Sequence, residues 1–204
     1  MGTVSPAIKI VAIGGTTRPN SSTEKALRQV LDVTEGLGAS GLLFSGADID
    51  LPMYQPGIGD RCERTARLLE ALREADGVII GSPGYHGGVS GLVKNVLDYT
   101  EDLRSDARCY LDGRAVGCIG TGAGWQGAAA ALTGLRAIVH ALRGWNTPIG
   151  LTVNTAEPAF DDDGKWIDSK LADQSALMAG QIMRFAWQSR AFAAAGGAPP
   201  AGAG

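Results

Sequence analysis

The segment that decides the fold is AIKIVAI, residues 7–13, followed by GGTTRPNSST, residues 14–23. The first part is a short apolar run that ends at two glycines, a pattern typical of a buried strand that runs into a turn. The second part leads into an amphipathic stretch over residues 21–33, where Ser21 and Glu24 have the spacing of a capping box. The segment therefore predicts a strand, a polar turn and a helix in immediate succession.

The same alternation continues along the chain and predicts the fold class. Short apolar strands that are bounded by glycine and joined by helices pair in parallel, with both faces of the sheet covered. Right-handed crossovers leave few arrangements, and we expect an α/β fold: a flavodoxin-like, doubly wound, five-stranded parallel sheet of order 2-1-3-4-5. The expected strands after the first are residues 41–45, 77–80, 115–119 and 149–153, and the expected helices are residues 21–33, 62–74, 89–99, 128–142 and 171–185 or beyond.

Length and composition predict one globular domain with a short tail. The chain has 204 residues, of which 45% are hydrophobic and 19% are charged, as in ordinary globular proteins. Residues 193–204, AAAGGAPPAGAG, are low in complexity and are expected to be flexible. We therefore assign residues 1–192 to a single domain and residues 193–204 to a tail.

Charge, hydropathy and cysteine content exclude several classes of function. A net charge of −3 favours neither nucleic acid nor an anionic membrane as a partner. The chain lacks an apolar run of about 18 residues and a charged, apolar leader, so neither a membrane span nor a signal peptide is expected. Cys62, Cys109 and Cys118 are few and have no C-x-x-C spacing, which favours a reducing, cytoplasmic location. We expect no metal site, because no cluster of ligands has suitable spacing.

The loop at residues 14–23 has the chemistry of a phosphate site. In an open parallel sheet, ligands bind beyond the carboxyl ends of the strands where the strand order reverses, here between the first and third strands. Hydroxyls and backbone N–H groups at a helix N-terminus bind anions, and Arg18 adds a charged, bidentate donor. Neither G-x-G-x-x-G nor G-K-[ST] occurs in this loop. A terminal phosphomonoester, as in a mononucleotide, suits it best; a capped helix start with a polar turn is the alternative.

The loop after the third strand, residues 82–88, has the features of a platform for a planar ring. Tyr85 offers a flat face, and Gly87 and Gly88 allow a ring to approach the backbone closely. Amides at the start of the next helix can donate to carbonyls on the ring's edge. The alternative is that Tyr85 and His86 form a plain surface turn.

Two segments together resemble the NADPH-dependent FMN reductase family. They are GTTRPNSST at residues 15–23 and PGYHGGVSGLVKNVLD at residues 83–98. Residues 50–54, DLPMY, are similar to that family's loop after the second strand, and the likeness extends over residues 8–153. The resemblance implies bound or exchangeable FMN, hydride transfer from NAD(P)H, and a homodimer or homotetramer.

The resemblance also implies roles for individual residues. His86 departs from the family pattern, which usually has a small or amide residue at that position, and its role stays open. The residues that fall at the family's FMN phosphate site are Thr16, Arg18, Ser21 and Thr23, with the backbone of Ser22; those at its ribityl and ring site are Pro83, Gly84, Tyr85, His86, Gly87 and Gly88.

Residues 122–127, GAGWQG, spell a dinucleotide fingerprint between a strand and a helix. Three observations argue against a Rossmann site: the motif follows the fourth strand, no acidic residue lies about 20 positions on, and the first turn already holds the phosphate loop. In the expected fold, Gly120, Thr121, Gly122 and Gly124 pass close to the flavin ring. Trp125 either covers the flavin, receives the nicotinamide, or packs at the helix start.

We therefore predict an NAD(P)H-dependent FMN reductase that passes electrons to a quinone, another small oxidant, oxygen or a flavin-dependent monooxygenase. No protein acid or base is required, because the cofactor carries the chemistry, and His86 and Trp125 are assigned only as modulators. A flavodoxin-type electron carrier without nicotinamide turnover is the alternative; the modest net charge and the glycine-rich second loop favour the enzyme. A flavin-binding regulatory protein without turnover is a third possibility.

Overall fold

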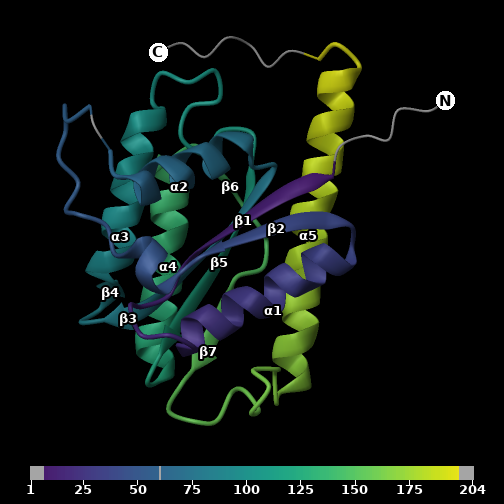
Figure 1. Ribbon diagram of the computed structural model, residues 1–204. Coiled ribbons are helices and arrows are strands. Elements are labelled where there is room, and N and C mark those ends of the chain that lie inside the picture. The colour runs from purple at the N-terminus through teal and green to yellow at the C-terminus, as the bar shows by residue number, and fades with distance from the viewer. Residues whose placement is uncertain (1–6, 60, 198–204) are drawn as a thin grey trace.

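A computed structural model describes residues 7–59 and 61–197 (Figure 1). Parallel strands form the central layer and helices cover both of its faces. The strands are β1 (Ile8–Gly14), β2 (Ala39–Phe44), β3 (Gly77–Tyr85), β4 (Gly88–Val89), β5 (Ala115–Gly122), β6 (Trp145–Asn146) and β7 (Leu151–Asn154). The helices are α1 (Ser22–Gly36), η1 (Gly46–Ile49), α2 (Glu63–Glu74), α3 (Gly91–Asp98), η2 (Tyr99–Leu103), α4 (Trp125–Ala141) and α5 (Ser169–Ala194).

The order of the long strands confirms the predicted topology. Strands β2, β1, β3 and β5 lie side by side in parallel, and β7 pairs with the second half of β5. The prediction of only five strands is wrong, because the described chain forms seven. β4 is a two-residue antiparallel partner of β3, and β6 pairs with the first half of β5. Pro148, which has no N–H to donate, lies in the gap that separates β6 from β7.

Two hydrophobic cores form, one on each face of the sheet. Successive strand residues point to opposite faces, so Val11 and Ile13 enter one core while Ile10 and Ala12 enter the other. The first core is shared with α2, α3 and α4, and the second with α1 and α5, as Figure 1 shows. Within the described residues, no helix has the length and apolarity needed to cross a membrane.

A buried arginine fastens the edge of the sheet opposite the predicted site. The Arg114 side chain is 1% exposed and donates to the carbonyls of Arg73 and Ala75 at 3.1 Å and of Tyr110 and Asp112 at 3.2 Å. Burial lowers the pKa of this guanidinium to about 10, which leaves it charged at neutral pH. These bonds join the end of α2 to the segment that enters β5, so the amino ends of β3 and β5 are tied together.

Candidate functional site

The backbones of β1 and β3 meet very closely where β1 ends. Gly14 is the register partner of Gly81, and a Cβ atom added to Gly14 would lie 1.8 Å from the Gly81 carbonyl oxygen. The Gly15 N–H also donates to that oxygen at 3.3 Å. The chain then leaves the sheet into the loop before α1, while β3 continues toward its hairpin. The first and third strands therefore diverge at the point where the strand order predicts a crevice.

The start of α1 presents free backbone donors. Ser21 is the N-cap, and its Oγ accepts from the Glu24 N–H at 3.3 Å, which confirms one half of the predicted capping box. The Glu24 carboxylate accepts from the Asn20 N–H at 3.2 Å instead of returning to the cap residue. The N–H groups of Ser22 and Thr23 donate to no oxygen within the described chain. The first turn of α1 therefore keeps two N–H groups that can donate hydrogen bonds to an anion.

The side chains of this loop divide into two groups. The Arg18 guanidinium and the Ser22 hydroxyl have no partner among the residues that the structure describes, and Arg18 is exposed. Thr16 is used within the loop, where its Oγ1 accepts from the Arg18 N–H at 3.1 Å. Thr23 faces inward: its hydroxyl lies 2.6 Å from that of Thr121, and both side chains are buried. Arg18, Ser22 and the helix amides are thus the accessible donors of the loop.

The loop after β3 is a tight hairpin. Tyr85 pairs with Gly88 across β3 and β4, so His86 and Gly87 are the two turn residues, with φ of 50° and 86°. Positive φ at both positions is the mark of a type I′ turn, which favours Asn and Gly. This geometry gives a physical reason for the amide or small residue expected at position 86. Tyr85 is 55% exposed and His86 is exposed, so both side chains are accessible.

Polar contacts beneath the hairpin hold it against α3. The buried Ser82 hydroxyl accepts from the Ser90 N–H at 3.0 Å, and Ser90 Oγ caps α3 by accepting from the Val93 N–H at 3.2 Å. Pro83 is buried and lies in register with Thr121 on β5. The third strand is therefore longer than predicted, and it brings Pro83 and Gly84 beside the end of β5.

The glycines of the GAGWQG motif pack α4 against the strands. A Cβ on Gly84 would lie 2.2 Å from the Gly127 carbonyl oxygen, and one on Gly122 would lie 2.8 Å from the Ala128 nitrogen. Gly120 belongs to the same contact, since its Cβ would lie 2.1 Å from the Ala128 oxygen. Gly124 differs: its φ is 119° and its Cβ position is open. Helix–strand packing accounts for Gly122 without a dinucleotide.

Trp125 is the first residue of α4, three positions earlier than the predicted helix start. Its side chain is 60% exposed, which contradicts the alternative of a packed aromatic at the helix start. The contact between Gly84 and Gly127 brings the start of α4 to the end of β3, so Trp125 and Tyr85 flank the same junction. Two exposed aromatic side chains therefore stand at the predicted ring site.

Two asparagines outside the predicted site residues support the loops of the site. Asn95 on α3 accepts from the Tyr54 N–H at 2.8 Å and donates to the Pro52 carbonyl at 2.9 Å, which fixes the loop after η1. Asn154, the last residue of β7, accepts from the Gly124 N–H at 2.8 Å. Asn95 lies in the quoted motif; Asn154 follows a predicted strand at the carboxyl edge, and that position was its only signal.

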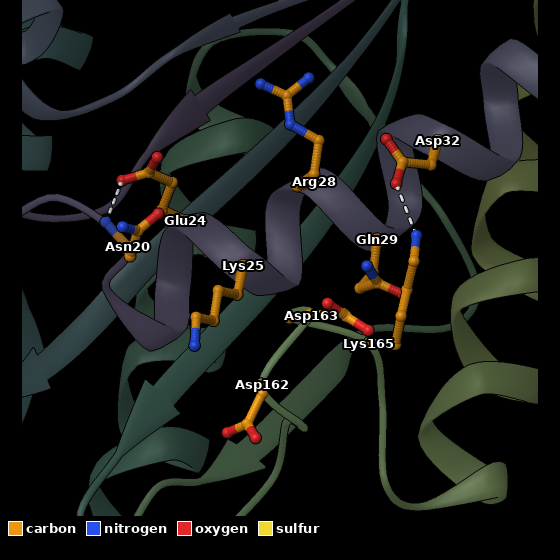
Figure 2. Close-up of a pocket in the computed structure, with 10 residues that line it drawn as sticks. Asn20, Glu24, Lys25, Arg28, Gln29, Asp32, Asp162, Asp163 and Lys165 are labelled. Atoms are coloured by element: carbon orange, nitrogen blue, oxygen red, sulfur yellow. Dashed lines mark hydrogen bonds and ion pairs between the residues drawn. The ribbon is translucent and has the colours of Figure 1, made fainter.

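A groove of about 340 Å³ lies away from this site, on the outer side of α1 beside the loop before α5 (Figure 2). Its charges are mixed: Lys165 pairs with Asp32 at 3.2 Å, Lys25 lies 5.8 Å from the centre of the Phe160 ring, and Asp162 and Asp163 line the same space. Among the described residues, no group of three or more His, Cys, Asp or Glu side chains is placed to hold a metal ion. In this groove acidic side chains accompany the basic ones, whereas in the loop at residues 14–23 Arg18 and the first amides of α1 are free donors within the described chain.

Comparison with known proteins gives a consistent result. The family model for NADPH-dependent FMN reductase matches residues 8–157. An FMN-dependent NADPH-azoreductase of Staphylococcus aureus is 29% identical over 185 residues, covering 87% of this chain and 95% of the relative.

Solved structures share the fold. A flavoenzyme NAD(P)H:(acceptor) oxidoreductase from Paracoccus denitrificans aligns with a TM-score of 0.71 and 23% identity over 91% of this chain and 98% of its own. An apo NADH:FMN oxidoreductase aligns with a TM-score of 0.67 and 23% identity over 86% and 90% of the two chains. A WrbA-like flavodoxin from Agrobacterium tumefaciens gives 0.57 and 18% over 91% and 99%.

Proposed function

Because the chain belongs to the NADPH-dependent FMN reductase family, it is an NAD(P)H-dependent oxidoreductase with FMN as its cofactor, and we propose that the loop at residues 14–23 holds the FMN phosphate. The observation that carries this proposal is the pair of free N–H groups at Ser22 and Thr23, beside an unpaired Arg18. A helix N-terminus with free amides and a guanidinium is a strong site for a phosphate dianion.

The residues of the loop fit a phosphomonoester in different ways. Arg18 and the Ser22 hydroxyl donate from side chains, and Ser22 and Thr23 donate from the backbone. Ser21 is 2% exposed and contributes as the N-cap, whose hydroxyl oxygen accepts from the Glu24 N–H. Thr16 orders the turn that presents Arg18, and Thr23 contributes its amide while its hydroxyl stays in the interior.

We place the flavin ring between the β3–β4 hairpin and the start of α4. The open Cβ positions of Gly87, Gly88 and Gly124 leave space for a ring close to the backbone. Tyr85 and Trp125 supply aromatic faces at the ring's border, and the latter is positioned to receive the nicotinamide. Pro83, Gly84, Gly120 and Gly122 shape the floor, and Thr121 joins it to α1.

When bound, FMN supplies the redox chemistry, a two-electron exchange with NAD(P)H. The protein's part is to bind the phosphate, orient the ring and leave one ring face open to a second flat molecule. No side chain is assigned as an acid or base in this step. His86 stands at the exposed hairpin tip, where its imidazole can contact an acceptor without taking part in nicotinamide oxidation.

The proposed acceptor is a small planar oxidant that stacks on the open ring face. A quinone or an azo compound suits two flanking aromatic side chains, and the azoreductase similarity supports the second of these. A flavin-dependent monooxygenase that takes up reduced FMN is the second candidate acceptor. A cytoplasmic location and a homodimer or homotetramer remain proposals drawn from the cysteine content and the family likeness.

A flavin titration followed by anaerobic reduction tests the function. Apo-protein is titrated with FMN and with riboflavin, and tighter binding of FMN is expected because only FMN carries the phosphate. The loaded protein is then mixed with NADPH or NADH without oxygen, and loss of flavin absorbance is expected with at least one of them. Equal affinity for both flavins would contradict the phosphate site, and no reduction by either nucleotide would favour an electron carrier. Light scattering of the same sample tests self-association against a single 21 kDa species.

A further inference from the structure

The side chain of Asn154 joins the carboxyl end of β7 to the start of α4. Its Oδ1 accepts two backbone hydrogen bonds, from the Gly124 N–H at 2.8 Å and from the Ala156 N–H at 3.0 Å. Asn154 is half-buried and is the register partner of Gly122 on β5. The Thr155 N–H adds a bond to the Gly122 carbonyl at 2.7 Å. The turn after β5 is therefore held from the neighbouring strand.

The other hydrogen bonds of Gly124 are local backbone bonds: its N–H also donates to the Gly122 carbonyl at 2.9 Å, and its carbonyl accepts from the Ala128 N–H at 3.3 Å. Gly124 is the N-cap of α4, has a φ of 119°, and supplies no side chain to cap the helix. A Cβ added at Gly124 would meet nothing within 4 Å. Within the described residues, the Asn154 carboxamide is the one side chain that bonds to Gly124. An uncapped glycine start samples more conformations than a capped one, because glycine has the largest backbone freedom.

The next residue, Trp125, depends on this turn for its position. Its side chain is 60% exposed and makes no ring–ring or cation–ring contact within the described part of the chain. An indole that is mostly exposed and makes no ring contact depends on its backbone for much of its position. Oδ1 of Asn154 thus acts on Trp125 through a single intervening peptide unit.

We infer that Asn154 is a positioning residue: by fixing Gly124 it holds the Trp125 indole where the nicotinamide stacks. The inference rests on the proposed function for the identity of the stacked ring, but the positioning itself is a property of the protein alone. What Asn154 contributes is an accepting oxygen. Aspartate keeps that oxygen, whereas leucine keeps the approximate volume and removes it.

The first test uses apo-protein and needs no turnover. Protein labelled with 5-fluorotryptophan has four fluorine sites, and the Trp125 resonance is assigned by its loss in W125F. We expect N154L to shift or broaden this resonance and N154D to leave it near the wild-type position. N146L is the matched control, because the Asn146 side chain also bonds to the backbone, by donating to the Arg136 carbonyl at 3.0 Å, at the other end of β5. The inference is overturned if the Trp125 resonance is unchanged in N154L, or if N146L and N154D change it as much as N154L does. N154A replaces N154L if N154L does not fold.

The second test connects positioning to the reaction. With FMN bound, N154L should raise the nicotinamide KM by about tenfold, the effect of losing roughly one to two hydrogen bonds, while N154D stays near wild type. FMN affinity should change less than KM in both. If wild-type protein fails to oxidise either nucleotide, the proposed function fails while the fluorine result still judges the positioning. If wild type turns over and N154L matches it, the positioning role is wrong.

Discussion

The hydroxyls of Thr23 and Thr121 lie 2.6 Å apart in the interior, although 98 residues separate them in the chain. Thr23 lies in the first turn of α1, and Thr121 is the second-last residue of β5. Both side chains are 2% exposed. The bond therefore ties the proposed phosphate loop to the strand that leads into the proposed ring site, so the distance between the two half-sites is fixed in the protein itself.

Replacing both threonines of this pair should cost less than the sum of the two single replacements. T23V and T121V each leave a buried hydroxyl without a partner, and each should lower the free energy of unfolding by about 1–3 kcal/mol. The double variant removes both hydroxyls and should lose less than the sum of the two single losses. Urea unfolding of the four proteins measures this coupling. Strict additivity would show that the two hydroxyls do not interact.

Arg18 should govern FMN affinity, whereas Arg28 should not. R18A removes a charged donor to the phosphate and should weaken FMN binding by about ten- to a hundredfold, equivalent to roughly 1.5–3 kcal/mol. Arg28 lies on α1, the helix that follows the loop, and lines the outer groove of Figure 2. R28A therefore removes one positive charge nearby and is the matched control. Fluorescence titration with FMN measures both. Equal weakening in the two variants would indicate a general electrostatic effect.

Much of the fold could be predicted from the sequence because its strands are short, apolar and bounded by glycine. Predicted and observed elements differ mainly at their ends. The third strand was predicted to stop at Ile80, since Gly81 and Pro83 signal a break, but Pro83 is tolerated at the strand's end and β3 runs to Tyr85. The glycine-rich GAGWQG segment predicts a helix start at Ala128, but α4 begins at Trp125, and its first turn packs against Gly84.

The site was predictable as a set of loops, but not in its internal bonding. Composition marked the hydroxyl-rich loop, yet which hydroxyls face outward depends on tertiary contacts: Thr23 turns inward to Thr121, which lies far away in the sequence. Asn154 carried no local signal beyond its place after an apolar run. Its partner Gly124 is brought to it only by the pairing of β5 and β7. The binding roles of the individual residues stay predictions that the variants test.

Replacing His86 by asparagine should stabilise the protein without impairing flavin reduction. His86 has a φ of 50°, where asparagine is better tolerated than histidine, so H86N should raise the free energy of unfolding by about 0.5–1 kcal/mol. The anaerobic rate of reduction by NAD(P)H should stay near wild type, because that step needs no proton from the protein. Stopped-flow absorbance measures the reductive and oxidative half-reactions separately. Loss of the reductive step with FMN still bound would place His86 in the chemistry.

Cys62 should react with alkylating reagents long before Cys118. The hydrogen bond with the Thr65 hydroxyl, at 3.2 Å, lowers the pKa of the exposed Cys62 thiol. Burial raises the pKa of Cys118 to about 12. Because the thiolate is the reactive form, raising the pH from 6 to 8 should accelerate alkylation of Cys62 while Cys118 stays protected in folded protein. Mass spectrometry after timed iodoacetamide treatment measures this order, and T65V should slow the reaction of Cys62.

Position 84 should tolerate no side chain, whereas position 88 should accept a methyl group. G84A places a Cβ within 2.2 Å of the Gly127 carbonyl oxygen and should destabilise the protein by several kcal/mol, at least about 2. Nothing lies within 4 Å of a Cβ on Gly88, so G88A should remain folded. Thermal unfolding compares the two. A stable G84A would show that α4 can move away from β3 at little cost.

The interruption between β6 and β7 has a consequence for association between chains. A strand from another molecule that approached this border of the sheet would find two residues, a break at Pro148, and then four residues, too short a template for intermolecular pairing. The opposite border, β2, offers six uninterrupted residues, with Leu42 53% exposed. Of these two borders, β2 is therefore the one that favours strand addition, and a lysine in place of Leu42 should suppress it.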